Sequence, residues 1–405
     1  MKTVCMKKIA GVLLLSAFCA GAFAEEFLFK YNAGDNYRIL STVQEDVYFN
    51  GIFSHHAEIV NRIGVDVTGT SGDWGTHDAV FMTSEASTDQ FGMPSFTWGE
   101  EYHSIFNRSV FGEYDIGDTY FMPVVRNVPV FPAKDLKPGD TWTAAGEEAH
   151  DLRRGFDMPR PFKVPFTVKY KYIGPETVNG KLLHKISAQY TMDFTNQNMP
   201  VDRTMDYPYY TQGFSKQTIY FDNEAGGIDH YSEEFRIIIE TAYGTVAVFE
   251  GTAQAEVTSQ SRAVKETKIE EVAEKIKDLG IENTAVTETE KGITISIENI
   301  QFRADSAFLM ESEKIKLRKI ATILQQYPDN DLLVSGHTAL AGSEKARQEL
   351  SEKRAQAVAA YLVELGVKDA YHIFSKGFGA EQPIAENTTE AGRARNRRVE
   401  ITILK

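Results

Sequence analysis

The feature that most constrains this chain is the alternation of apolar and polar side chains through its first 260 residues. In residues 162–171, apolar residues alternate one by one with Lys, Thr or Pro, and residues 63–67 and 235–239 repeat the pattern. A period of two places successive side chains on opposite faces of a strand, as in sheets with one buried and one solvated face. We therefore predict an antiparallel β domain over residues 25–261, built as one unit or as two subdomains.

The sequence constrains the architecture of this β domain, sandwich or barrel, less than it constrains the antiparallel strands themselves. Its apolar faces are short and interrupted, as in YFDNEAGGIDHYSEEF (220–235), where a turn separates two strands. Membrane-spanning strands need a lipid-facing band about ten residues long. We therefore expect a soluble domain, either a sandwich or a partly open barrel. Residues 91–132, rich in Phe, Tyr, Pro and Gly, are interpreted as a loop that packs on the sheet or lines a pocket.

Residues 1–24 are predicted to be a secretory signal peptide. A basic start with three lysines precedes an apolar run that ends in the small-residue pattern Ala22-Phe23-Ala24. The run is too short and wrongly flanked for a membrane span. Two alternatives remain: an uncleaved anchor, and lipidation at Cys19, although Phe18 stands where lipidation needs a small residue.

Charge and cysteine content exclude several functions. Without its three lysines, the cleaved chain has 40 basic and 57 acidic residues, a net charge of −17. This balance argues against nucleic acid and against docking on anionic lipid. Both cysteines, Cys5 and Cys19, lie in the signal peptide, so the mature chain has no disulfide and no thiol nucleophile. No later stretch reaches transmembrane length.

The pattern changes after residue 261. Residues 262–290 are predicted to form a helical connector, in which a charged helix with a narrow apolar stripe ends at Gly280. Over residues 291–405, strands alternate with helices. One helix is expected to follow Ser312 as its N-cap and to end before Pro328. One-sided strands in this order predict a two-layer α/β sandwich, so the whole chain is a multidomain α+β protein.

Several motifs of the last domain resemble one family. They are IQFRADSAFL (300–309), VSGHT (334–338), LSEKRAQAVAAYL (350–362), GFGAEQPIAEN (377–387) and GRARNRRVEI (392–401). In order and spacing they resemble the OmpA-like domain of peptidoglycan-associated envelope proteins, over residues 293–405. The resemblance implies a domain that binds diaminopimelate, a zwitterionic residue of the cell-wall peptide. The β domain resembles no family with comparable specificity.

The resemblance implies two charged contacts to diaminopimelate. An arginine, here Arg354, meets its carboxylate, because a guanidinium can donate two parallel charge-assisted bonds. Arg397 matches a position beside the ligand. The helix pattern supports a special role for Arg354, since it interrupts an apolar stripe formed by its neighbours at helical spacing. Such a charge faces a cleft or pairs internally, for instance with Glu400 or Asp305.

The second contact is missing. After Thr338, where the family has a carboxylate that meets the ammonium, stands Ala339. Arg347 replaces the family's usual asparagine and adds positive charge. Losing one charge-assisted bond costs roughly 1.5–3 kcal/mol, on the order of a tenfold to hundredfold loss of affinity. Glu344 and Asp305 are the acids that would have to substitute.

These observations predict an exported, non-enzymatic envelope protein. We expect it in the periplasm, either free or attached to the outer membrane, as a tether or scaffold whose peptidoglycan binding is weakened or lost. The alternative is an interaction protein whose OmpA-like domain binds an envelope protein while the β domain binds a lipid or another ligand. No catalytic constellation, cofactor motif or metal-ligand spacing is present in the sequence.

Overall fold

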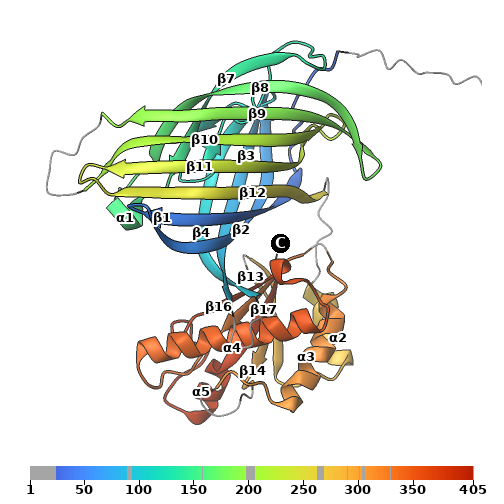
Figure 1. The fold of residues 1–405 in the computed structure, drawn as a ribbon. Helices are drawn as coiled ribbons and strands as arrows, with labels where there is room; N and C mark the ends of the chain where they lie inside the picture. Colours follow the sequence, from blue (N-terminus) through green and yellow to red (C-terminus); the bar gives the residue numbers. More distant parts are fainter. Residues whose placement is uncertain are drawn as a thin grey trace, which may run out of the picture.

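The computed structural model shows a curved β sheet followed by a smaller α/β domain (Figure 1). The structure describes residues 24–88, 94–156, 158–197, 206–261, 269–289, 291–300, 302, 306–328 and 330–404. The predicted signal peptide, including Cys5 and Cys19, lies outside the described residues except for Ala24. None of the helices in the described ranges is both long and apolar enough to cross a membrane.

The N-terminal region is one antiparallel sheet that curves almost into closure. Its strands are β1 (Asn36–Phe49), β2 (Ile52–Ser71), β3 (Trp74–Thr88), β4 (Pro94–Ser109), β5 (Tyr114–Ile116), β6 (Val125–Arg126), β7 (Thr141–His150), β8 (Phe162–Val178), β9 (Lys181–Thr195), β10 (Pro208–Asp222), β11 (Gly227–Thr241) and β12 (Val246–Ser261). A short helix, α1 (Arg153–Phe156), follows β7. Pairing between β1 and β12 joins two meanders, which run from β1 to β5 and from β12 to β6. The prediction of an antiparallel β region is confirmed.

Alternation explains how this sheet buries one face. In β8, Val164, Val168 and Tyr172 are buried in an apolar cluster, whereas Lys169 and Lys171 are exposed. The same cluster contains rings from outside the strands, including Phe27 near the start of the described chain and Phe131 in the loop after β6. The sheet therefore wraps around part of its own connecting chain. Our interpretation of residues 91–132 as loop is wrong where they form β4, β5 and β6; β4 pairs with β3 along a ladder that has one register shift.

The C-terminal domain is a two-layer sandwich, as predicted. Its elements are α2 (Ile269–Asp278), β13 (Thr284–Thr289), β14 (Gly292–Glu298), α3 (Glu311–Leu324), β15 (Leu332–Gly336), α4 (Glu344–Glu364), the 3-10 helix η1 (Ala370–His372), β16 (Ile373–Gly377), α5 (Glu390–Asn396) and β17 (Arg398–Leu404). The sheet order is β13-β14-β17-β15-β16, with only β15 and β16 parallel among these pairs. Ile295, Val334 and Ile401 share a core with Ile320 of α3 and Val358 of α4.

Two of the predicted elements differ in the structure. The helix α3 begins at Glu311 after Met310, so Ser312 lies inside it and does not cap it. The segment expected as a helical connector contains the short helix α2 and also the strand β13; residues 262–268 of it lie outside the described residues. Gly280, with φ of +58°, ends α2 as predicted. The amides of Gly280 and Ile281 bond back to the carbonyls of Lys277 and Ile276, the pattern of a Schellman cap.

The second face of the C-terminal sheet packs on the N-terminal sheet. Leu333, Phe374 and Leu404 form a buried cluster with Val60 of β2, whose side chain points out of the curved sheet. The edge strand β16 also pairs in parallel with β4. Figure 1 shows β1, β2 and β4 on the side of the large sheet that faces the C-terminal domain. A shared apolar core and a shared edge therefore join the two domains.

A buried ion pair lies inside this contact. Arg62 Nε donates to Asp331 Oδ2 at 2.8 Å, and the two side chains are 4% and 17% exposed. The guanidinium lies 3.6 Å above the Phe374 ring, and Asp331 Oδ1 also contacts His372 Nδ1 at 2.6 Å. Burial opposes ionisation of Asp331, but His372 and Arg62 outweigh it and lower the pKa of this carboxyl.

Replacing Asp331 should therefore weaken the whole chain. In Asp331→Ala the Arg62 charge stays buried without its acid, so we expect the free energy of unfolding to fall by about 3–5 kcal/mol. Urea unfolding followed by circular dichroism measures this change. The control is Glu250→Ala, which removes the partner of Arg236 in a pair whose side chains are 40% and 48% exposed; it should change stability by less than about 1 kcal/mol. Equal effects of the two substitutions would contradict a structural role for the buried pair.

Candidate ligand-binding site

The GHT motif forms a buried turn at the end of β15. The amide of His337 donates to the carbonyl of Arg398, and the amide of Thr338 donates to the carbonyl of Gly379. A Cβ at Gly336 would collide with the Ser351 carbonyl oxygen of α4, so close packing of this strand end on the helix requires glycine. The turn is thus held by β17, by the loop after β16 and by α4.

The motif histidine has a structural environment. The His337 ring is 3% exposed and stacks on Phe378, with centroids 5.2 Å apart and planes 6° apart. Its Nε2 lies 3.5 Å from Glu400 Oε2, too long for a good hydrogen bond. Burial lowers the pKa of His337. Burial also opposes ionisation of Glu400, but His337 and Arg398 outweigh it and lower the pKa of Glu400 to about 2.

Thr338 and Ala339 lie side by side in the turn, each only 7% exposed. Thr338 Oγ1 has no hydrogen-bond partner among the described residues. Leu340 follows them and is 58% exposed, while its amide donates to Asn387 Oδ1. The turn therefore presents a methyl group at the position where the resemblance implies a carboxylate.

Arg354 lies in the middle of α4 and is half-buried. Its Nε donates to the Ser306 carbonyl at 3.4 Å, and its guanidinium carbon lies 4.8 Å from the centre of the Phe302 ring. Both residues belong to the segment between β14 and α3, in which Asp305 lies outside the described residues. Glu400, considered above as an internal partner of Arg354, accepts a bond from Arg398 Nε at 2.6 Å.

The two other arginines named from the sequence lie on different elements, Arg397 after α5 and Arg347 on α4. Arg397 is half-buried at the end of α5, and its Nη2 bonds Glu390 Oε1 at 2.8 Å. Arg347 lies seven residues before Arg354, on the same face of α4 and about 10 Å away along its axis. Its Nη1 donates to the Gly342 carbonyl at 2.6 Å, while its Nε is buried without a partner in the described chain.

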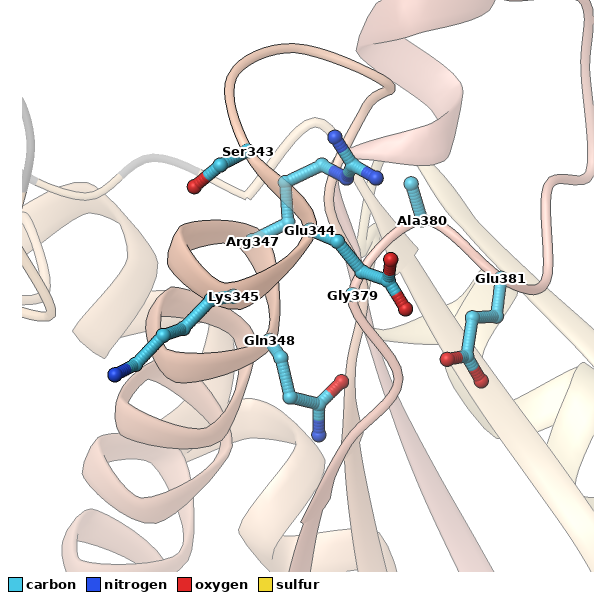
Figure 2. A pocket seen from close by; sticks show the side chains of 8 residues that line it. All are labelled: Ser343, Glu344, Lys345, Arg347, Gln348, Gly379, Ala380 and Glu381. Atoms are coloured by element: carbon cyan, nitrogen blue, oxygen red, sulfur yellow. The ribbon is translucent and has the colours of Figure 1, made fainter.

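Arg347 also borders a hollow of about 620 Å³ beside the first turn of α4. Charged side chains of both signs line this hollow, together with Gln348 and the backbone of Gly379. Figure 2 shows Glu344 directed toward Glu381 across it, while Lys345 points away. The hollow is open and mixed in charge, and Glu344 lies ten residues before Arg354. That spacing is about 15 Å along the helix, so Glu344 is too distant to share one ammonium-carboxylate group with Arg354.

Several supporting residues were not nominated from the sequence. Ser351 is fully buried; its Oγ donates to the Gln348 carbonyl and accepts from the Gly379 amide. The Asn396 amide bonds Ile384, Ala385 and Asn387, and so holds the loop that precedes α5. Small polar residues inside the motifs LSEKRA and RARNRR were the available signal. Ser351 fixes the loop at Gly379, and Asn396 fixes the loop before α5.

Acid should weaken this turn through Glu400. Its pKa is lowered from 4.5 to about 2, so its stabilisation is present above pH 4.5 and is lost as the pH falls toward 2. Glu400→Gln should lower the free energy of unfolding by roughly 2–3 kcal/mol at neutral pH, and the difference should shrink across that acid range. Urea titrations of both chains at several pH values measure it. Glu349→Gln, at an exposed site, should change stability by less than about 0.5 kcal/mol, and a deficit of Glu400→Gln that stays constant with pH would contradict the account.

Comparisons with known proteins concern the C-terminal domain. Residues 301–397 match the OmpA family. A probable lipoprotein of Escherichia coli, YiaD, is 38% identical over 123 residues, which are 30% of this chain and 56% of that protein. The peptidoglycan-binding protein ArfA of Mycobacterium tuberculosis is 42% identical over 104 residues, 26% of this chain and 32% of ArfA. This chain therefore spans about half and about a third of these two relatives.

Among solved structures, the cell wall anchor of the T6SS from Pseudomonas aeruginosa is 29% identical, with a TM-score of 0.30. The match covers 35% of this chain and 99% of the anchor. The motifs of the sequence and the family match agree on the same residues. Residues 301–397 of this chain are an OmpA family domain.

Proposed function

We propose that this chain is an exported, non-enzymatic tether of the cell envelope, whose C-terminal domain binds the diaminopimelate of peptidoglycan weakly. The observation that carries the proposal is the position of Arg354, half-buried on α4 beside Phe302 and Ser306. A guanidinium held there can bind a carboxylate with two parallel bonds. The family match and the peptidoglycan-binding relative ArfA support the choice of ligand.

Weak binding follows from the buried Ala339. The turn is held in place by backbone bonds that do not depend on this side chain, so the frame of the site persists while its acidic group is missing. Arg347 places a further cation on the same face of α4 as Arg354. An ammonium group near this turn thus meets no carboxylate from residue 339. It meets the additional positive charge of Arg347 instead, and both effects favour weak binding.

The docking of the two domains supports the role of a tether. Asp331, which bonds the N-terminal sheet through Arg62, directly precedes β15, whereas His337 and the candidate turn directly follow it. The five-residue strand therefore separates the Arg62–Asp331 pair from the turn by about 16 Å. A wall-bound C-terminal domain would hold the N-terminal sheet at a set position, in the periplasm or at the outer membrane.

Removal of the Arg354 guanidinium should weaken binding to peptidoglycan. In Arg354→Ala, retention of the full mature chain on purified peptidoglycan should fall about tenfold or more, because a charge-assisted contact is lost. A co-sedimentation assay over a range of peptidoglycan concentrations measures this. The control Arg236→Ala, an exposed arginine of β11, should bind like the wild type. Retention that does not change in Arg354→Ala would contradict the proposed site.

A carboxylate at position 339 should strengthen binding to peptidoglycan. In Ala339→Asp, binding to the same peptidoglycan should strengthen by roughly tenfold to hundredfold, because the carboxylate restores a bond to the ammonium. Ala339→Asn, of the same size but uncharged, should strengthen it much less. If the wild type does not bind and Ala339→Asp does not restore binding, the interaction-protein alternative is favoured instead.

A further inference from the structure

Exposed apolar side chains of the N-terminal region gather at one end of its sheet. Eight large apolar or aromatic side chains of this region are between 40% and 73% exposed in the described chain. Three of them, Ile105, Ile173 and Leu182, lie elsewhere on the sheet, and such scattered residues are normal. The other five come from three segments at one end, and they are Phe49, Ile52, Phe53, Tyr209 and Tyr243. A cluster of this kind is typical of a surface that contacts a partner or a membrane.

Strand pairing places the three segments side by side. β1 and β11 both pair antiparallel with β12, and β10 pairs antiparallel with β11. The end of β1 and the starts of β10 and β12 therefore lie at the same end of the sheet, to which the arrowheads of β9 and β11 point in Figure 1. The Asn50 amide donates to the Val246 carbonyl, and the Ala242 amide donates to the Tyr207 carbonyl. These bonds join residues 48–53, 207–210 and 241–246 into one surface, which we call the aromatic rim.

The turn between β1 and β2 exposes apolar side chains on both of its faces. It is a two-residue turn, Asn50-Gly51, with both residues at positive φ, as this residue pair favours. Phe49 lies opposite Ile52, and Tyr48 lies opposite Phe53. Opposite residues share a face and successive residues alternate, so the two pairs point to opposite faces of the hairpin. Each pair includes an exposed apolar side chain, so the sheet covers neither face of this tip.

Polar backbone groups of the rim bond within the chain. The Val246 amide donates to Asn50 Oδ1 at 2.9 Å, and the Tyr243 amide donates to Asp206 Oδ1 at 3.0 Å. An apolar phase offers no partner to a free N–H or C=O group, so transfer of an unpaired group into it is costly. The internal bonds remove this cost for the groups that they pair, and the tips of the rim are therefore suited to an apolar surrounding.

The sequence around the rim lacks charge. Residues 47–54, 207–215 and 241–249 contain no Asp, Glu, Lys or Arg, although these types make up 25% of the chain. Tyrosine and phenylalanine fill nine of these 26 positions, against 11% aromatic residues in the whole chain. Tyrosine rings and apolar side chains are typical of segments that lie at a membrane–water interface, where an apolar ring and a polar hydroxyl both find suitable surroundings.

The charges next to the rim limit how far it can enter a membrane. On the outer face of the sheet, Asp46 of β1 lies opposite Glu250 of β12. Asp46 precedes Phe49 by three residues, which is about 10 Å along the strand. The apolar side of an interfacial segment enters a membrane by about 5–10 Å, so these carboxylates can stay in water. Asp206 and Glu240, which border the turn after β11, are acids as well, and this favours a zwitterionic surface over an anionic one.

We propose that the aromatic rim docks on the surface of a lipid bilayer with zwitterionic headgroups. Phe49, Ile52 and Phe53 enter the boundary between the headgroups and the acyl chains, while Tyr209 and Tyr243 lie at the level of the headgroups. The contact gains its free energy from apolar burial and needs no cation of the protein. This surface belongs to the N-terminal sheet, so the proposal goes beyond peptidoglycan binding and does not rest on it.

The test measures flotation of the full mature chain, residues 25–405, with phosphatidylcholine vesicles. The wild type should float with the vesicles, and high salt should not release it, because the contact is not ionic. In the double variant Ile52→Ser/Phe53→Ser, the affinity for the vesicles should fall about tenfold or more, because two apolar side chains no longer enter the bilayer. The matched control Ile173→Ser/Leu182→Ser removes two exposed apolar side chains of β8 and β9 and should bind like the wild type.

A fluorescent label distinguishes a bilayer from a protein partner. Residues 25–405 contain no cysteine, so Ile52→Cys can carry a polarity-sensitive dye as the single label. Its emission should shift to the blue when vesicles are added, whereas the same dye on Leu182→Cys should not shift. Leu182 is 59% exposed near the turn between β8 and β9, at the opposite end of the sheet.

Three results would overturn the proposal. The first is a wild type that does not float with the vesicles, and the second is flotation that Ile52→Ser/Phe53→Ser leaves unchanged. The third is a wild-type dimer, seen by sedimentation, that this double variant dissociates while neither chain binds vesicles; it would assign the rim to a second copy of the chain. None of these assays contains peptidoglycan, so their failure is distinct from a failure of the proposed wall binding.

Discussion

The structure depends on how the C-terminal sheet buries both of its faces. The central strands β14 and β15 are buried almost throughout, although the helices α3 and α4 cover only one side. On the other side, Leu333, Phe374 and Leu404 need a cover, which strand β2 provides through Val60. Apolar burial is strong but has no direction. Directional contacts between Arg62 and Asp331 and between β16 and β4 therefore set how the two domains meet.

This arrangement has consequences for the candidate site. The strand β15 connects Asp331, the partner of Arg62, at one end with the turn of Thr338 and Ala339 at the other. Backbone bonds, Ser351 and the Asn396 amide hold the turn and its neighbouring loops, so the frame does not depend on the side chain at position 339. A protein of this kind can lose the carboxylate and keep the fold. The OmpA family domain of residues 301–397 is therefore compatible with Ala339, and a lower affinity for its ligand is what we propose.

Local sequence patterns predicted much of this fold. The elements that these patterns did not predict depend on contacts between segments far apart in the chain. The alternation in β8 and the helix expected before Pro328 depend on neighbouring residues, and the structure contains both, as β8 and α3. By contrast, β13 has the sequence TAVTET, whose polar side chains carry little strand signal, and pairing with β14 decides its conformation. The two meanders form one sheet through pairing between β1 and β12, some 200 residues apart in the chain.

The same distinction applies to individual charges. Arg354 could be selected because it interrupts an apolar stripe within one helix. Arg62 and Arg108 could not, since each occupies a strand position that looks like an ordinary polar residue in the sequence. Only the fold shows that the C-terminal domain covers Arg62 and that the sheet encloses Arg108. Asp305, which the sequence nominated both as a partner of Arg354 and as a substitute acid, lies outside the described residues.

The most direct test compares two kinds of peptidoglycan. The mature wild-type chain is titrated with sacculi that contain diaminopimelate and with sacculi that carry lysine at the same position of the stem peptide. Lysine keeps the ammonium group but lacks the carboxylate that Arg354 is proposed to bind. The account predicts weak binding that favours diaminopimelate about tenfold. Equal binding to both sacculi, or binding to neither, would contradict it.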